Sequence, residues 1–145
     1  MTYSLITLII TRMSLTPSNM LPLGTKAPTF NLVDAVTKNS YSLEDIKGTK
    51  GTVVMFICNH CPFVKHVNDE LVRTANDYRV TGFGFVALNS NDIEKYPQDH
   101  PDLMWKTARE ENYPFPYLFD ATQDVAKAYK AACTPDFFVF DAELL

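Results

Sequence analysis

Two cysteines separated by two residues, Cys58 and Cys61, are the part of the sequence best suited to chemistry. Sulfurs at this spacing can approach to the length of a disulfide bond, about 2.05 Å, without a movement of the backbone. A continuous apolar and β-branched run at residues 52–57 precedes them, and Pro62 after them suits the first turn of a helix. The order of strand, Cys-x-x-Cys and helix predicts a redox-active dithiol rather than two unrelated thiols.

The helix expected after the dithiol bears on its reactivity. We expect the sulfur of Cys58 to face the unpaired N–H groups at the start of that helix, which favours the thiolate and lowers the pKa. His60 lies between the two cysteines and, when protonated, would add a positive charge beside the thiolate. These arguments make Cys58 the attacking thiol, with a pKa below the usual value, and place Cys61 deeper in the fold.

Zinc binding is the main rival interpretation of a Cys-x-x-Cys pair. A structural zinc ion needs four ligands, and the candidates here are Cys58, Cys61, His66 and Cys133. The sequence holds no second Cys-x-x-Cys pair, which favours redox chemistry with no cofactor and no bound metal. A metal-binding or metal-delivery module that uses Cys58, Cys61 and His66 remains the alternative from another functional class.

Composition excludes several other classes of protein. The chain has 145 residues, of which 46% are hydrophobic and 21% charged, as in a single globular domain. A net charge of −4 without a basic block argues against nucleic-acid binding, and no run approaches the roughly 20 apolar residues of a membrane span. Three cysteines are too few for a disulfide scaffold, and the apolar residues 5–10 lack the preceding positive charge of a secretory signal. We therefore expect a cytoplasmic protein.

Strand-like runs alternate with helical patterns along the chain, which predicts an α/β domain with a sheet covered on both faces. Residues 1–23 are expected to form an irregular leader and residues 24–145 the domain. Strands are expected at 29–33, 52–57, 83–88, 117–119 and 137–140, and helices near 42–48, from Pro62, at 101–111 and at 120–130. In the second helix, one face at helical spacing is expected to be buried: Phe63, Val67, Leu71, Ala75 and Tyr78. In the third, the residues expected to point partly inward are Leu103, Trp105 and Ala108.

With these pieces placed, the sequence resembles the thioredoxin-fold superfamily, and more closely its alkyl hydroperoxide reductase/thiol-specific antioxidant (AhpC/TSA)-like branch. The resemblance runs from residues 24–32 through 42–45, 53–56 and the Cys-x-x-Cys pair to residues 132–138. It implies a thiol–disulfide oxidoreductase in which Cys58 attacks a substrate disulfide and Cys61 resolves the mixed disulfide. The implied substrates are protein or small-molecule disulfides and thiols, with a reductase as a further partner.

The resemblance also implies a role for the segment around Pro135. The Thr134–Pro135 bond is expected to be cis and to face the dithiol, so that Thr134 offers its backbone groups to an incoming chain. Cys133, directly before them, is a candidate third thiol.

A peroxiredoxin-like thiol peroxidase is the enzymatic alternative. Peroxiredoxins carry proline seven residues, and threonine or serine three residues, before the reactive cysteine. Before Cys58 these positions hold Gly51 and Met55, and before Cys61 they hold Val54 and Cys58. We therefore predict weak peroxidase activity.

The family fold continues beyond the strand that follows the cis-proline, with one more strand and a helix. This sequence ends at Leu145. We expect the C-terminal strand and helix to be missing and one sheet edge to be exposed. That edge is expected to be covered by dimerisation or by the apolar residues 5–10.

Overall fold

Six strands form one mixed sheet in the computed structural model, which describes residues 16–145. The strands are β1 (Asn31–Asp34), β2 (Ser40–Ser42), β3 (Gly51–Phe56), β4 (Phe83–Asn89), β5 (Tyr117–Phe119) and β6 (Asp136–Asp141). Their order across the sheet is β2-β1-β5-β4-β3-β6. Strands β3, β4 and β5 run parallel, whereas β1, β2 and β6 pair antiparallel with their neighbours. This arrangement confirms the α/β fold with a central mixed sheet.

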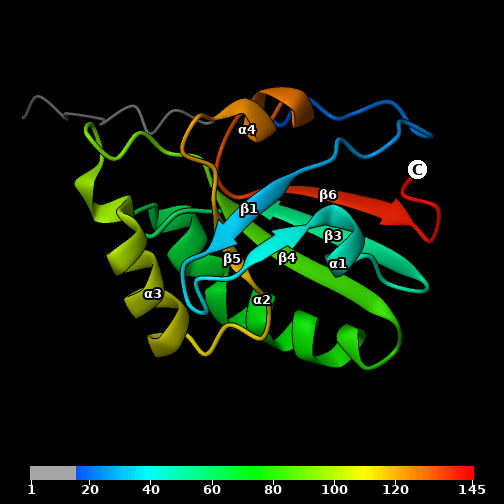
Figure 1. The fold of residues 1–145 in the computed structure, drawn as a ribbon, viewed down its shortest axis with the longest axis horizontal. Coiled ribbons are helices and arrows are strands. Elements are labelled where there is room, and N and C mark those ends of the chain that lie inside the picture. The colour runs from blue at the N-terminus through cyan, green and yellow to red at the C-terminus, as the bar shows by residue number, and fades with distance from the viewer. Residues whose placement is uncertain (1–15) are drawn as a thin grey trace, which may run out of the picture.

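Helices cover the two faces of the sheet (Figure 1). They are α1 (Leu43–Ile46), α2 (Pro62–Arg79), α3 (Pro101–Glu110) and α4 (Asp124–Tyr129), with a short 3-10 turn, η1 (Pro97–Asp99), before α3. Helix α1 begins at a capping box, in which the Ser42 side chain accepts from the Asp45 N–H and the Asp45 carboxylate accepts from the Ser42 N–H. Proline in the first turn begins α2 and α3, as the sequence predicted for both.

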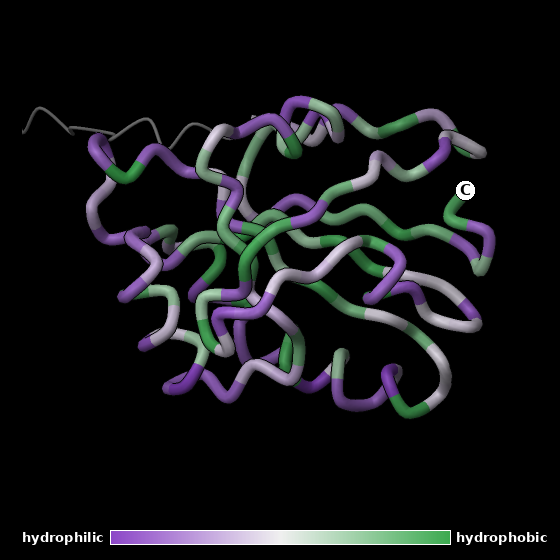
Figure 2. The backbone as a smooth tube through the Cα atoms, viewed as in Figure 1, coloured by the Kyte–Doolittle hydropathy of each residue, from purple (hydrophilic) through white to green (hydrophobic). Residues whose placement is uncertain are grey.

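Alternation along the strands divides the core into two layers. Side chains at even positions of β3 and β4, among them Val54 and Leu88, pack with α1 and α4 on one face. Side chains at odd positions, among them Met55 and Ala87, pack with α2 and α3 on the other. Figure 2 shows the central strands as largely hydrophobic, whereas the α2 trace alternates between polar and apolar residues. Cys58 belongs to the second layer, directly after β3.

The buried faces of two helices match the expected ones only in part, at Ala75 and Ala108. In α2 the buried residues are Val64, Asn68 and Ala75, while Phe63 and Tyr78 are exposed. Because α2 carries apolar residues at both 63 and 64, its periodicity alone permits either face. In α3 the buried residues are Met104 and Ala108, while Leu103 and Trp105 are exposed and the Trp105 ring stacks against the Arg109 guanidinium.

The segment after α1 passes close to the sheet at two glycines. A Cβ atom on Gly84 would lie 1.9 Å from the carbonyl oxygen of Ile46, and one on Gly48 would lie 2.3 Å from the backbone nitrogen of Gly84. No side chain fits between these backbones, so both positions require glycine. This close approach holds α1 against β4.

Strand β6 forms one edge of the sheet among the described residues (Figure 1). Its outward residues Phe137 and Val139 are 44% and 68% exposed, and they line an apolar cavity of about 460 Å³ beside α2. On the opposite face, residues of the expected leader contact the domain, since Ser18 Oγ donates to Asp136. Residues 5–10, expected as one cover for this edge, lie outside the described part of the chain, and dimerisation stays a prediction. None of the helices found in residues 16–145 is long and apolar enough to cross a membrane.

Candidate functional site

The two cysteines lie between the carboxyl end of β3 and the start of α2, but their exposure is opposite to the expected order. Cys58 follows Ile57, whose N–H donates to the Leu88 carbonyl at 3.0 Å, and the Cys58 residue is only 1% exposed. Cys61 is the N-cap of α2 and is partly exposed. The prediction that Cys61 lies deeper is therefore wrong, because the helix begins after the second cysteine and not at the first.

Burial controls the protonation of Cys58. It raises the pKa of the Cys58 thiol from 9.0 to about 11, and the negative charge of Asp99 adds to the rise. The hydroxyl of Thr134, 3.3 Å from Cys58 Sγ, acts in the opposite direction by hydrogen bonding to the thiolate. The lowered pKa expected for Cys58 is therefore wrong, because the loss of hydration on burial outweighs the hydrogen bonds that the sulfur makes with Thr134 and the Cys61 backbone.

Cys61 occupies the position at which the helix can stabilise a negative charge. No side chain caps the N-terminus of α2, and the Cys61 carbonyl accepts the first-turn hydrogen bond from the Lys65 N–H at 3.1 Å. The Cys61 thiol donates to the Thr134 carbonyl at 3.4 Å. A thiolate here would face the positive end of the helix dipole and unpaired N–H groups, which is the environment that the sequence argument assigned to Cys58.

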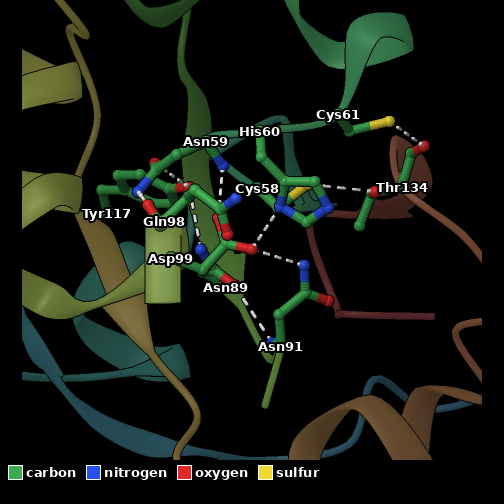
Figure 3. Close-up of polar contacts among 10 residues, drawn as sticks. All are labelled: Cys58, Asn59, His60, Cys61, Asn89, Asn91, Gln98, Asp99, Tyr117 and Thr134. Atoms are coloured by element: carbon green, nitrogen blue, oxygen red, sulfur yellow. Dashed lines mark hydrogen bonds and ion pairs between the residues drawn. The ribbon is translucent and has the colours of Figure 1, made fainter. Parts of the chain in front are cut away.

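The Thr134–Pro135 peptide bond is cis, as predicted. Thr134 faces the dithiol and contacts both sulfurs, Cys58 through its hydroxyl and Cys61 through its carbonyl (Figure 3). The thiol of Cys133 points elsewhere and donates to the Pro135 carbonyl at 3.7 Å. Burial, together with the nearby charges of Asp136 and Cys61, raises the pKa of Cys133.

A cavity of about 550 Å³ opens in front of Cys61, within the size range of small-molecule sites. Its lining includes the more exposed dithiol cysteine and the third thiol, together with polar groups from α4 and the loops: His60, Cys61, Ser90, Gln123, Lys127, Cys133 and Thr134. Cys58 is not part of this lining. A substrate entering from solvent therefore meets Cys61 before Cys58.

A buried carboxylate, Asp99, organises the Cys-x-x-Cys loop from below (Figure 3). The residue is fully buried, and one carboxylate oxygen accepts from the Asn59 N–H at 2.7 Å. The other accepts from the Asn91 side chain at 2.8 Å and lies 2.6 Å from His60 Nδ1. With these three contacts the carboxylate has compensation for the loss of water.

His60 is held on two sides. Its Nδ1 faces Asp99, and its ring stacks on Tyr96 with centroids 4.9 Å apart and planes 10° from parallel. The side chain is 30% exposed. A ring nitrogen of His60, a carboxylate oxygen of Asp99 and Cys58 Sγ all lie within 4.8 Å of one another. The sequence placed His60 near the thiols, and the structure adds the buried carboxylate that orients it.

Polar side chains beneath the loop complete its support. The Asn59 amide donates to the Gln98 carbonyl at 2.9 Å, and its side-chain oxygen accepts from the Tyr117 hydroxyl at 3.0 Å. Tyr117 also accepts from the Asn89 side chain at 3.3 Å. The loop between the cysteines is thus tied to β4, β5 and η1.

The residues that could bind a metal in the structure differ from those expected from the sequence. Within residues 16–145, the cluster that could offer three ligands is Cys58, His60 and Asp99. His66 is exposed on α2 and does not belong to it, so the set of Cys58, Cys61 and His66 is wrong. The cluster fits a metal poorly, because Asp99 already accepts three protein hydrogen bonds and Cys58 is a thiol whose pKa burial raises.

The sequence alone did not predict a role for Asp99, Asn91 or Tyr96. A signal existed for Asn91, because the polar residues 89–92 follow a buried strand, and the carboxyl ends of parallel neighbouring strands meet at one edge. Asp99 lies in a short turn between two prolines, Pro97 and Pro101, without any periodic pattern. Only the packing of η1 against the loop reveals its role.

Comparison with known proteins gives the following matches. The model of the AhpC/TSA family matches residues 23–144. An uncharacterized conserved protein from Geobacillus kaustophilus is 62% identical with a TM-score of 0.87, over 88% of this chain and 67% of that chain. A hypothetical protein from Sinorhizobium meliloti 1021 is 44% identical with a TM-score of 0.85, over 89% of this chain and 70% of that one.

A more distant match has a similar fold. The thioredoxin domain of a thiol-disulfide oxidoreductase from Bacteroides vulgatus is 24% identical with a TM-score of 0.69, over 86% of this chain and 85% of that chain. No curated protein sequence matches the chain.

Proposed function

We propose that this chain, which belongs to the AhpC/TSA family, is a thiol–disulfide oxidoreductase in which Cys61 attacks the substrate disulfide and Cys58 resolves the mixed disulfide. The family and the thioredoxin-like fold were both expected from the sequence, and both are confirmed. The assignment of roles reverses the order expected from the sequence. A redox role agrees with the family, whereas the specific reaction is our proposal.

The observation that carries the proposal is the shared contact of both thiols with Thr134. Cys61 Sγ lies 3.4 Å from the Thr134 carbonyl and Cys58 Sγ lies 3.3 Å from its hydroxyl. Cys61, at the helix N-terminus and on the cavity, can exist as an attacking thiolate that a substrate reaches. Cys58, buried behind it, is protected from solvent and suits the second step.

The reaction exchanges one disulfide for another. The Cys61 thiolate attacks a substrate sulfur, so that a Cys61–substrate disulfide forms and the substrate disulfide breaks. Cys58 then attacks Cys61 Sγ, which forms the Cys58–Cys61 disulfide and releases the reduced substrate. Protein or small-molecule disulfides are the proposed substrates, and a separate reductase or thiol would restore the dithiol. A cytoplasmic location, in which the dithiol rests mostly reduced, is part of the proposal.

A peroxidase would need a different partner for Cys61. The residue three positions before Cys61 is Cys58, so a thiol stands where peroxiredoxins carry a hydroxyl. The Thr134 hydroxyl contacts Cys58 and not Cys61. We therefore propose disulfide reduction as the main activity and expect slow peroxide turnover.

A paired assay tests the proposal. Reduction of insulin disulfides by the protein in the presence of a small dithiol measures exchange, and loss of titratable thiols with and without hydrogen peroxide measures peroxide turnover. Cys61→Ser should abolish insulin reduction, and Cys58→Ser should halt the enzyme as a mixed disulfide with its substrate. Cys133→Ser is the matched control, because it removes a nearby thiol outside the proposed pair.

Three results would contradict the proposal. One is insulin reduction that survives Cys61→Ser. Another is a peroxide rate that exceeds the insulin rate and disappears with Cys61→Ser, since this would identify a peroxidase. The third is one equivalent of tightly bound metal in the protein isolated under reducing conditions, which would favour the cluster of Cys58, His60 and Asp99.

A further inference from the structure

We propose that Asp99 and His60 act as a dyad that removes the proton from Cys58 when Cys58 resolves the mixed disulfide. This inference rests on the proposed function and adds to it the group that makes the second step fast. His60 is the proton acceptor, and Asp99 is a positioning residue that acts through His60.

The second step faces a problem of protonation. Only a thiolate attacks a disulfide at a useful rate, yet Cys58 is buried and its pKa is raised to about 11. With that pKa, roughly one Cys58 in ten thousand is a thiolate at pH 7. A base within reach of the sulfur would supply the thiolate at the moment of attack.

His60 meets the geometric requirement for that base. A ring nitrogen lies within 4.8 Å of Cys58 Sγ, a separation that a proton can cross through one bridging water. Stacking on Tyr96 and the contact of Nδ1 with Asp99 fix the plane of the ring.

Asp99 has the environment of a dedicated carboxylate. It is fully buried, although a buried aspartate is costly unless it is paired and hydrogen bonded. Its partners are the Asn59 N–H, the Asn91 amide and His60, and two of these belong to the loop between the cysteines. Its negative charge stabilises the imidazolium that forms when His60 takes the proton, which is the role of the aspartate in hydrolase triads.

Atoms and charges balance across the step. The Cys58 S–H bond breaks and the proton moves to His60, while Cys58 Sγ forms a bond to Cys61 Sγ. The bond between Cys61 and the substrate sulfur breaks, and its electron pair leaves with that sulfur. The substrate thiolate then takes the proton from His60. The enzyme is oxidised by two electrons and the substrate is reduced by two.

The titratable and charged groups near His60 come from three segments. The Cys-x-x-Cys loop contributes Cys58 and Cys61, η1 contributes Asp99, and the turn before η1 contributes Lys95 and Tyr96. The Lys95 ammonium lies 5.7 Å from the centroid of the Tyr96 ring. Of these, Asp99 is the negative group in direct contact with the ring.

A single-turnover reaction with a coloured aromatic disulfide separates the two steps. The Cys133→Ser protein is used throughout, so that only the proposed pair reacts. Attack by Cys61 releases the first coloured thiolate, and resolution by Cys58 releases the second. Because an aromatic thiolate leaves without a proton, the rate of the second phase reports the deprotonation of Cys58.

Two variants remove the dyad without removing either sulfur. Asp99→Asn and His60→Gln should each slow the second phase about 10- to 100-fold at pH 7, the range expected for loss of a general base, and should change the first phase less than about threefold. In the double variant, the rate of the second phase should lie within about twofold of the rate in either single variant, since the two residues act as a unit. As the pH approaches 11, hydroxide replaces the base, and the variants should converge with the parent protein.

Asp34→Asn is the matched control. Asp34 is another buried aspartate, 2% exposed, that accepts from the Thr37 N–H, the Thr37 hydroxyl and the Tyr117 N–H, away from the dithiol. It should leave both phases within about threefold of the parent, which is less than the loss of a general base would cause.

The outcomes distinguish this inference from the proposed function. Absence of a second phase in the parent protein would overturn the role of Cys58 itself. A normal second phase in His60→Gln, or an equal slowing of both phases at every pH in both variants, would overturn the dyad and leave the dithiol mechanism standing. If Asp99→Asn does not fold, His60→Gln, whose side chain is partly exposed, decides the question alone.

Discussion

The Thr134 hydroxyl lies 3.3 Å from the sulfur of the buried Cys58. This contact is the factor that most lowers the pKa of a thiol which burial otherwise raises. The reactivity of the buried cysteine thus depends on a residue from the loop before β6. The same residue offers its carbonyl to Cys61.

Replacement of Thr134 by valine should slow resolution selectively. A hydrogen bond worth about 1 kcal/mol corresponds to about a fivefold loss of Cys58 thiolate, and the second phase with the coloured disulfide should fall by that factor. Thr134→Ser is the control, because it retains the hydroxyl. An equal rate for Thr134→Val and the parent protein would show that the contact does not stabilise the thiolate.

Alkylation should label Cys61 before Cys58. Cys61 is partly exposed at the start of α2, whereas Cys58 is buried with a pKa of about 11. In the reduced Cys133→Ser protein near pH 7, a small alkylating agent should modify Cys61 at least about tenfold faster, since only the thiolate reacts. Mass spectrometry of the digested protein measures the order. Earlier labelling of Cys58 would restore the assignment made from the sequence.

Stability should fall at alkaline pH through Cys58. Its pKa rises from 9.0 in the ordinary thiol to about 11 in the folded chain, so the folded state holds the proton more tightly. This tighter proton binding stabilises the folded chain fully below pH 9. As the pH rises through 11, the stabilisation is lost and the free energy of unfolding falls by about 3 kcal/mol. Burial also raises the pKa values of Tyr113 and Tyr129, which act in the same direction at higher pH.

The Cys58→Ala protein isolates this contribution, since it retains both tyrosines. Urea unfolding of the reduced proteins at pH 8 and pH 11 should show a smaller loss of stability in Cys58→Ala than in the parent. Equal losses would mean that the folded protein does not raise the pKa of Cys58.

Replacement of Gly84 by alanine should prevent normal folding. The added Cβ would lie 1.9 Å from the Ile46 carbonyl oxygen, and neither backbone can move without separating α1 from β4. We expect a loss of more than about 3 kcal/mol, at the upper end for overpacking. Gly24→Ala is the control, because no atom lies within 4 Å of its added Cβ and only its φ of +80° opposes the change. It should cost about 1 to 2 kcal/mol in thermal or urea unfolding.

The sequence predicted most of the elements because their signals are local. The capping box at Ser42, the apolar run before Cys58 and the proline after Cys61 each mark a boundary that the structure contains. Local signals were weaker for the buried faces of helices. In α2, adjacent apolar residues at 63 and 64 permitted two faces, and contact with the sheet selected the one through Val64.

The structure brings Cys58, Cys61 and Thr134 together, as the sequence predicted, but with the two cysteines in the opposite order of burial. A Cys-x-x-Cys spacing identifies a dithiol, yet it does not say which cysteine begins the helix. Here the proline at the first helical position makes Cys61 the N-cap and leaves Cys58 at the end of the sheet. Asp99 could not be predicted, because its contact with His60 joins residues 39 apart in the sequence and depends on the fold of η1.

The contacts of Thr134 also govern when the dithiol can work during synthesis of the chain. Cys58 and Cys61 are made 76 and 73 residues before Thr134, so the ribosome must add that length before either sulfur meets its partner. At about 5 to 20 residues per second, this interval lasts roughly 4 to 15 seconds. Throughout it the chain lacks both Thr134 and β6. The contacts between Thr134 and the two sulfurs therefore form only late in synthesis, when the segment before β6 has been made.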